Sequence, residues 1–175
     1  MERYGVARHT LRAALRQLAG EGLVRIEPHR GASVARLGPA EVTGLYELRA
    51  ALEIEAAQLA LERHGGRLPE SVHGALAALE AACAGPDPAW SDVSHAHAAL
   101  HGAIVAASES PRIVAAHSAL TGELLLILSQ LQPHVEAGLL AADHAALVAA
   151  LEREGAGVLR AHLREAAETL GARLA

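Results

Sequence analysis

The stretch that decides the fold is YGVARHTLRAALRQLAGEGLVRIEPHRGASV, residues 4–34. Its apolar residues Leu11, Ala14, Leu15 and Leu18 recur at the spacing of one helix face, which predicts a helix over residues 8–20. Gly22 can adopt the left-handed conformation that ends a helix. Residues 23–27 and 32–36 are short strand candidates, and residues 28–31 form the turn between them. We therefore expect a helix followed by a two-stranded wing.

Everything beyond a linker at residues 37–39 has helical character. Gly and Pro residues separate the helical segments of this part. Ser110-Pro111 is typical of a helix start, with proline in the first turn. Six helices are expected, at about 40–63, 69–83, 90–107, 111–131, 135–153 and 156–174. The predicted fold is mostly α, with a small domain at residues 1–37 and an antiparallel six-helix bundle at residues 38–175.

The composition supports a helical core and a protein of the cytoplasm. Hydrophobic residues make up 51% of the 175 residues, but Phe is absent, so the core must be built from Leu, Ala, Val and Ile. The single cysteine, Cys83, excludes an intramolecular disulfide and is expected to be a buried apolar residue. There is no signal-peptide pattern and no run of 18 apolar residues, so no membrane association is expected.

Charge is unevenly placed along the chain. Residues 1–36 hold seven Arg and three Glu, a net charge of +4, whereas the remainder carries −9. A basic head on an acidic body suggests a local surface for a polyanion. The alternative is a solvated, arginine-rich helix beside a surface hairpin. For DNA, the start of the helix would meet base edges and the turn of the wing would meet phosphates. The candidate contacts are Arg8, His9, Thr10, Arg12, Arg16, His29 and Arg30.

The head resembles the winged helix-turn-helix of the GntR family of bacterial transcription regulators. The resemblance rests on Gly5-Val6-Ala7-Arg8, on the run from Leu11 to Leu15, on Gly22-Leu23-Val24 and on the basic turn that ends at Gly31. It covers only the C-terminal half of such a domain, because the first helix and nearly all of the second have no counterpart after Met1. It implies a recognition helix, binding to a palindromic DNA operator, and a homodimer.

Histidines on three predicted helices form a candidate metal site. His97 and His101 are four residues apart and so share one helix face, while His144 and His162 lie on later helices. Imidazole suits zinc, nickel, iron or copper better than magnesium, and zinc or nickel is the expected metal. The alternative is a set of scattered, solvated histidines.

The helical part resembles the FCD ligand-binding domain of the FadR-like branch, beginning with the helix that contains residues 45–53. That group often holds a divalent metal through one Asp and three His, and the metal and a basic side chain bind a small organic acid. In this pattern His101 matches a family histidine, and His97 stands where Asp is usual. His162 is the least secure ligand because its spacing from His144 is short by about one turn. His134 is a possible substitute, and His95 points away from the shared face.

Two further side chains have alternative interpretations. Arg49 is a candidate to bind the carboxylate of an effector. The alternative is that it forms an ion pair with Glu53 or Glu55. Trp90 is expected to close the end of the bundle rather than to stack on a ligand.

The leading hypothesis is a metabolite-responsive transcription regulator. The family resemblance, and no particular residue, implies a repressor. The second is a truncated protein that binds metal and effector but not DNA. A metalloenzyme is disfavoured, because there is no phosphate loop, nucleophile motif or specific base beside the histidines.

Overall fold

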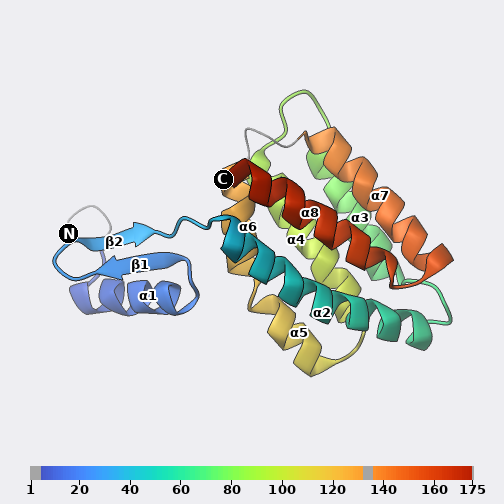
Figure 1. Ribbon diagram of the computed structural model, residues 1–175, viewed down its shortest axis with the longest axis horizontal. Helices are drawn as coiled ribbons and strands as arrows, with labels where there is room; N and C mark the ends of the chain where they lie inside the picture. The colour runs from blue at the N-terminus through green and yellow to red at the C-terminus, as the bar shows by residue number, and fades with distance from the viewer. Residues whose placement is uncertain (1–4, 132–135, 175) are drawn as a thin grey trace. The chain divides into compact units, whose positions relative to one another are not determined.

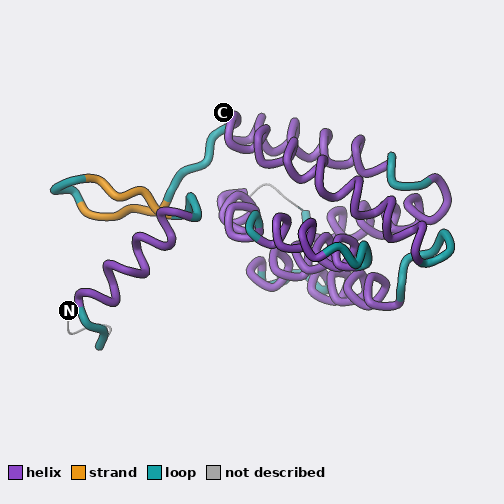
Figure 2. The backbone as a smooth tube through the Cα atoms, turned by 90° about the horizontal axis from the view of Figure 1, so that it is seen from below, coloured by secondary structure: helices purple, strands orange, loops and turns teal. Residues whose placement is uncertain are grey.

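The computed structural model describes residues 5–131 and 136–174, which divide into two compact units, one ending at Leu37 and the other beginning at Gly38. The first unit contains helix α1 (Arg8–Gly20) and an antiparallel hairpin of β1 (Val24–Glu27) and β2 (Gly31–Val34), as Figure 2 shows. The predicted order of helix and two-stranded wing is confirmed.

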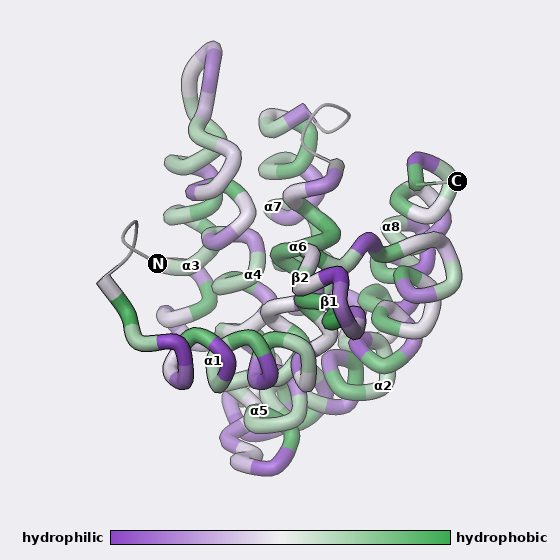
Figure 3. The backbone as a smooth tube through the Cα atoms, turned by 90° about the vertical axis from the view of Figure 1, so that its left-hand side faces the viewer, coloured by the Kyte–Doolittle hydropathy of each residue, from purple (hydrophilic) through white to green (hydrophobic). Residues whose placement is uncertain are grey.

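Glycine ends α1 in the manner that the sequence predicted. Gly22 has a φ of 74°, its N–H bonds to the carbonyl of Ala19, and the next N–H, that of Leu23, bonds to the carbonyl of Leu18. This pair of bonds is the Schellman ending of a helix. In the hairpin, His29 and Gly31 have φ values of 65° and 89°, which lets four residues reverse the chain. No residue of α1 is buried, and hydrophilic and hydrophobic bands alternate along it (Figure 3).

The second unit is built from helices alone in its described residues (Figure 1). They are α2 (Pro39–Arg63), α3 (Glu70–Cys83), α4 (Trp90–Ala106), α5 (Pro111–Ser118), α6 (Thr121–Leu131), α7 (Ala137–Glu154) and α8 (Val158–Leu174). Helix α2 packs along α8 and also against α4 and α5, while α3 lies against α4 and α7. Helix α4 therefore runs through the interior of the unit.

The prediction of six helices is wrong in one place, since residues 111–131 form two helices instead of one. The N–H of Leu120 turns back to the carbonyl of His117, and a new helix starts when the N–H of Leu124 bonds to Leu120. Thr121 and Gly122, at the break, are weak helix formers. The apolar pattern continues across the break, so periodicity did not reveal it.

The core is aliphatic, as the absence of Phe required. Its largest fully buried apolar side chains are Leu79, Leu100, Ile104, Ile127, Leu151, Leu159 and Leu163. Ala56, Ala57 and Ala60 are fully buried on α2, where small side chains let neighbouring helices approach closely.

One stretch of the described chain, Pro111–Gln130, is long and apolar enough to cross a membrane by composition. It covers α5 and all but the last residue of α6, whose central part is hydrophobic (Figure 3). The break between α5 and α6 interrupts this stretch, and its His117 is buried in a polar contact. A core helix of a folded domain has the same composition, so the stretch is weak evidence for a membrane span.

Candidate metal centre

Three helices bring the four predicted histidines together inside the second unit. Helix α4 supplies His97 and His101, α7 supplies His144, and α8 supplies His162. The centroid of the His97 ring lies 4.9 Å from that of the His101 ring and 4.7 Å from that of the His144 ring. One ligand nitrogen from each of these three buried residues lies within 4.8 Å of the others. The ring of His162 is 4.8 Å from that of His144 and 5.7 Å from that of His101.

Hydrogen bonds determine which nitrogen of each ring carries the proton. Nδ1 of His101 lies 2.7 Å from Oε2 of Glu53, and Nδ1 of His144 lies 2.8 Å from the carbonyl oxygen of Leu140. Since both partners are acceptors, each Nδ1 must donate a proton. The Nε2 atoms then carry lone pairs, and these two atoms lie 3.2 Å apart. A third buried nitrogen, Nδ1 of His97, has no hydrogen-bond partner.

The imidazoles are held in the neutral form that a metal requires. Burial, followed by the neighbouring rings, lowers the pKa of His144 to about 3, and burial lowers the pKa of His162 to about 3. Burial and the rings of His101 and His144 hold the pKa of His97 well below its ordinary value. For His101 burial also lowers the pKa, although the carboxylate of Glu53 opposes the shift.

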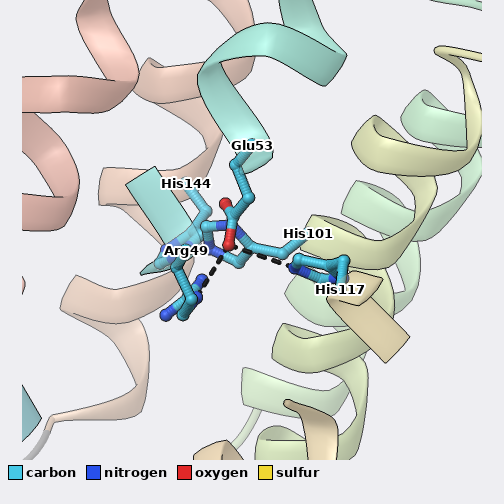
Figure 4. A network of polar contacts seen from close by, with 5 residues as sticks. All are labelled: Arg49, Glu53, His101, His117 and His144. Carbon is cyan, nitrogen blue, oxygen red and sulfur yellow. Dashed lines mark hydrogen bonds and ion pairs between the residues drawn. The ribbon is translucent and has the colours of Figure 1, made fainter. Parts of the chain in front are cut away.

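Glu53 is the centre of the polar network in Figure 4, and the sequence did not identify it as a site residue. It is fully buried on α2. Besides His101, it accepts a bond of 2.7 Å from Nε of Arg49 and lies 3.1 Å from Nε2 of His117 on α5. Burial disfavours its charge, but Arg49 and His101 hold the pKa of its carboxyl well below the ordinary value. Glu53 therefore links a histidine of the cluster to the buried arginine.

Arg49 forms the ion pair with Glu53 through Nε, and the other two guanidinium nitrogens make no hydrogen bond. Its Nε–Oε1 distance is 2.7 Å, and its Cζ lies 4.7 Å from the centroid of the Tyr46 ring. Burial opposes its charge, but Glu53 and Tyr46 raise its pKa. The buried Nη1 and Nη2 atoms have no hydrogen-bond partner, an arrangement that costs free energy unless an acceptor binds there.

A cavity of about 560 Å³ opens beside these groups. Arg49 and Tyr46 of α2 line its inner end together with the four histidines. The remaining described lining is Leu128, Glu136, Leu139, Leu140, Asp143, Ala146, Leu147, Ala150, Glu165, Ala166, Thr169, Leu170 and Arg173. The imidazole cluster and the buried guanidinium thus meet one solvent-accessible space.

Other residues singled out in the sequence lie outside this site. His95 is exposed, with Nδ1 2.6 Å from the carbonyl oxygen of Ser91 one turn earlier. Trp90 is buried and donates from Nε1 to the carbonyl of Leu128, so it closes the space between α4 and α6. Cys83 is buried, and burial raises the pKa of its thiol. His134 lies outside the described residues.

The candidate DNA contacts all lie in the first unit. Arg8, His9, Thr10, Arg12 and Arg16 are exposed on α1. His29 and Arg30 are exposed in the turn of the wing, where Arg30 forms an ion pair of 3.3 Å with Glu27. The basic helix and the basic turn belong to the same compact unit.

Two families of domains match this chain. Residues 44–169 match the FCD domain, and residues 1–34 match the bacterial regulatory proteins of the gntR family. A protein of Paenarthrobacter nicotinovorans named "Probable D-xylose utilization operon transcriptional repressor" is 28% identical over 148 residues. The match covers 85% of this chain but only 64% of that relative.

Solved structures share the fold. A candidate GntR transcriptional regulator from Rhodococcus sp. RHA1 has a TM-score of 0.74 at 23% identity, over 94% of this chain and 80% of its own. McbR/YncC of E. coli has a TM-score of 0.76 at 19% identity, over 98% of this chain and 84% of its own.

Proposed function

The chain belongs to the FCD domain family, and we propose that it is a DNA-binding transcription regulator controlled by a small organic acid bound beside a metal ion. The match of residues 1–34 to the gntR family supports the DNA-binding part. The name of the Paenarthrobacter relative favours a repressor.

The main support for a metal is the 3.2 Å distance between the Nε2 atoms of His101 and His144, which are unprotonated when both rings are neutral and donate from Nδ1. Two lone pairs at this distance repel each other unless a proton or a metal ion lies between them, and burial disfavours the extra proton on either ring. Two imidazoles bound to one zinc at the tetrahedral angle have nitrogens about 3.3 Å apart. His97, with its unpartnered Nδ1, is the third proposed ligand, and His162 is the fourth. An all-imidazole set favours zinc or nickel over magnesium.

The proposed effector site combines the metal with Arg49. The metal would act as a Lewis acid toward an oxygen of the effector. The two Nη atoms of Arg49 form a planar fork that matches a carboxylate, and they are buried without a partner. Glu53 holds the guanidinium at Nε, which leaves the Nη edge for the ligand.

For DNA, we propose that α1 enters the major groove with Arg8, His9, Thr10 and Arg12 nearest the base edges. Arg16 and the wing residues His29 and Arg30 would contact phosphates. A homodimer would place two such heads on the halves of a palindromic operator. Effector binding would change the packing of the helical domain and so shift the population of DNA-binding dimers.

The second candidate is a protein that binds metal and effector but not DNA. It is favoured by α1, whose residues are all at least partly exposed. A DNA-binding domain needs a packed core to hold its recognition helix.

Selection from a library of random 30-base-pair duplexes by the zinc-loaded chain distinguishes the two candidates. A regulator enriches an inverted repeat, and replacement of Arg12 and Arg16 by Gln weakens binding and lowers its salt dependence. The matched control replaces Arg153 and Arg164, which are exposed in the second unit, and leaves binding unchanged. Without enrichment, the second candidate is the better description.

A further inference from the structure

We propose that the effector is a monocarboxylate with an apolar body, such as a medium-chain fatty acid, and neither a sugar acid nor a dicarboxylate. This inference rests on the proposed function, in which the carboxylate lies against Arg49 and the metal. It adds the part of the ligand that lies beyond the carboxylate, which the rest of the cavity must accommodate.

The inner end of the cavity has one place for an anion. Arg49 is the only buried cation among the described lining residues, and its Nε is already bound to Glu53. Its two free Nη atoms suit the two oxygens of one carboxylate.

Most of the described lining beyond Arg49, Tyr46 and the histidines is apolar. It includes Leu128 of α6, Leu140 and Leu147 of α7, and Ala166 and Leu170 of α8. Outside the inner end, the described lining offers one uncharged hydrogen-bonding side chain, that of Thr169. The hydroxyl groups of a sugar acid would lose their water there without gaining partners, which costs free energy for each group. An alkyl or aryl body gains free energy from the same wall.

The exposed charged side chains of the described lining are mainly acidic. They are the carboxylates Glu136, Asp143 and Glu165 and one cation, Arg173. A second carboxylate at the far end of the ligand would meet this negative potential. The cavity of about 560 Å³ falls within the usual size of small-molecule sites and has room for more than a two- or three-carbon acid.

Calorimetric titration of the zinc-loaded chain tests the proposal with butanoate, hexanoate, octanoate, suberate and gluconate. Each added methylene should tighten binding about three- to fourfold. Octanoate should bind at least about tenfold more tightly than suberate, which has the same length and a second carboxylate. Equal affinities along the series, or tighter binding of suberate or gluconate, would overturn the apolar-body proposal but leave the metal and carboxylate site intact. If the chain takes up no zinc, or if no carboxylate binds, the proposed function itself fails.

A variant with a larger side chain in the cavity lining tests where the alkyl chain of the ligand lies. Ala166 lies one turn beyond His162 on α8, so Ala166→Leu should weaken octanoate about tenfold and leave butanoate nearly unchanged. The control Ala78→Leu makes the same change on the exposed face of α3 and should bind octanoate normally. Equal octanoate affinity in the two variants would place the chain elsewhere and contradict the proposal.

Discussion

Nε2 of His101 and Nε2 of His144 lie 3.2 Å apart in the interior of the helical domain, and in the neutral form that burial favours for both rings neither Nε2 carries a proton. Each ring has its proton on Nδ1, where Glu53 and the carbonyl of Leu140 accept it. Two neighbouring acceptors that face each other in a buried site are unfavourable in the absence of a cation. A metal ion bound by both Nε2 atoms would remove this repulsion.

The three closely grouped histidines should contribute more to metal binding than the fourth. We expect His97→Ala to weaken zinc binding by at least about a hundredfold, because it removes a buried ligand. His162→Ala should have a smaller effect, since its ring lies farthest from His101. Competition with a zinc chelator measures both affinities, and His95→Ala on the exposed face of α4 serves as the control. A larger loss for His162→Ala would contradict this ligand assignment.

Glu53→Gln should impair both the fold and the metal site. It leaves the buried charge of Arg49 without its counter-ion, which costs about 3–5 kcal/mol of unfolding free energy. It also weakens the hydrogen bond that orients His101, so zinc affinity should fall about ten- to a hundredfold.

The exposed Glu55→Gln on the same helix should change neither property. His117→Gln keeps the bond between Glu53 and His101, and its zinc affinity should stay close to that of the parent chain. Denaturant titration and chelator competition together separate loss of folding from loss of metal affinity. Normal zinc affinity in a folded Glu53→Gln variant would show that the carboxylate does not position His101.

The metal-free chain should lose stability as the pH falls below about 6.5. The folded-state pKa values of His144 and His162 are about 3, so these rings stay neutral in the fold while the unfolded chain takes up protons. Each such histidine lowers the free energy of unfolding by about 1.4 kcal/mol per pH unit between about pH 6.5 and 3, and its contribution is fully present above 6.5. Urea midpoints at pH 7.5, 6.0 and 5.0, measured with a chelator present, check the slope. A stability that is constant over this range would show that the imidazoles are not held neutral.

The first unit should exchange its amide protons much faster than the second. No residue of α1 is buried, and Leu11 and Val34 are 48% and 67% exposed. A unit of this size with so little burial has a small opening free energy. Hydrogen exchange followed by mass spectrometry should show strong protection in α4 and little in α1. Equal protection would mean that the first unit is stabilised by contacts absent from the described residues.

Local signals in the sequence predicted much of this architecture. The four-residue spacing of His97 and His101 placed both rings on one face of α4, and Gly22 marked the end of α1. Both follow from helix geometry alone, which acts over a few residues.

The missed features depend on contacts between distant parts of the chain. Glu53 meets His101 across 48 residues and His117 across 64, so no local pattern could identify it as the centre of the network. For Arg49 the sequence left two alternatives, an ion pair or a contact with an effector. The structure shows the ion pair with Glu53 and also places Arg49 in the lining of the cavity. A four-residue spacing could show only the first of these. The break between α5 and α6 was missed because apolar residues continue through it.

The most direct test is the metal content of the purified chain, measured by elemental analysis after loading with zinc or nickel and removal of the excess. We expect about one metal ion per chain, and much less in a variant that combines His101→Ala with His144→Ala. The matched control combines His73→Ala with His95→Ala, two histidines outside the cluster, and should retain the metal. A parent chain that holds neither metal, or a double variant that holds as much as the parent, would contradict the metal site.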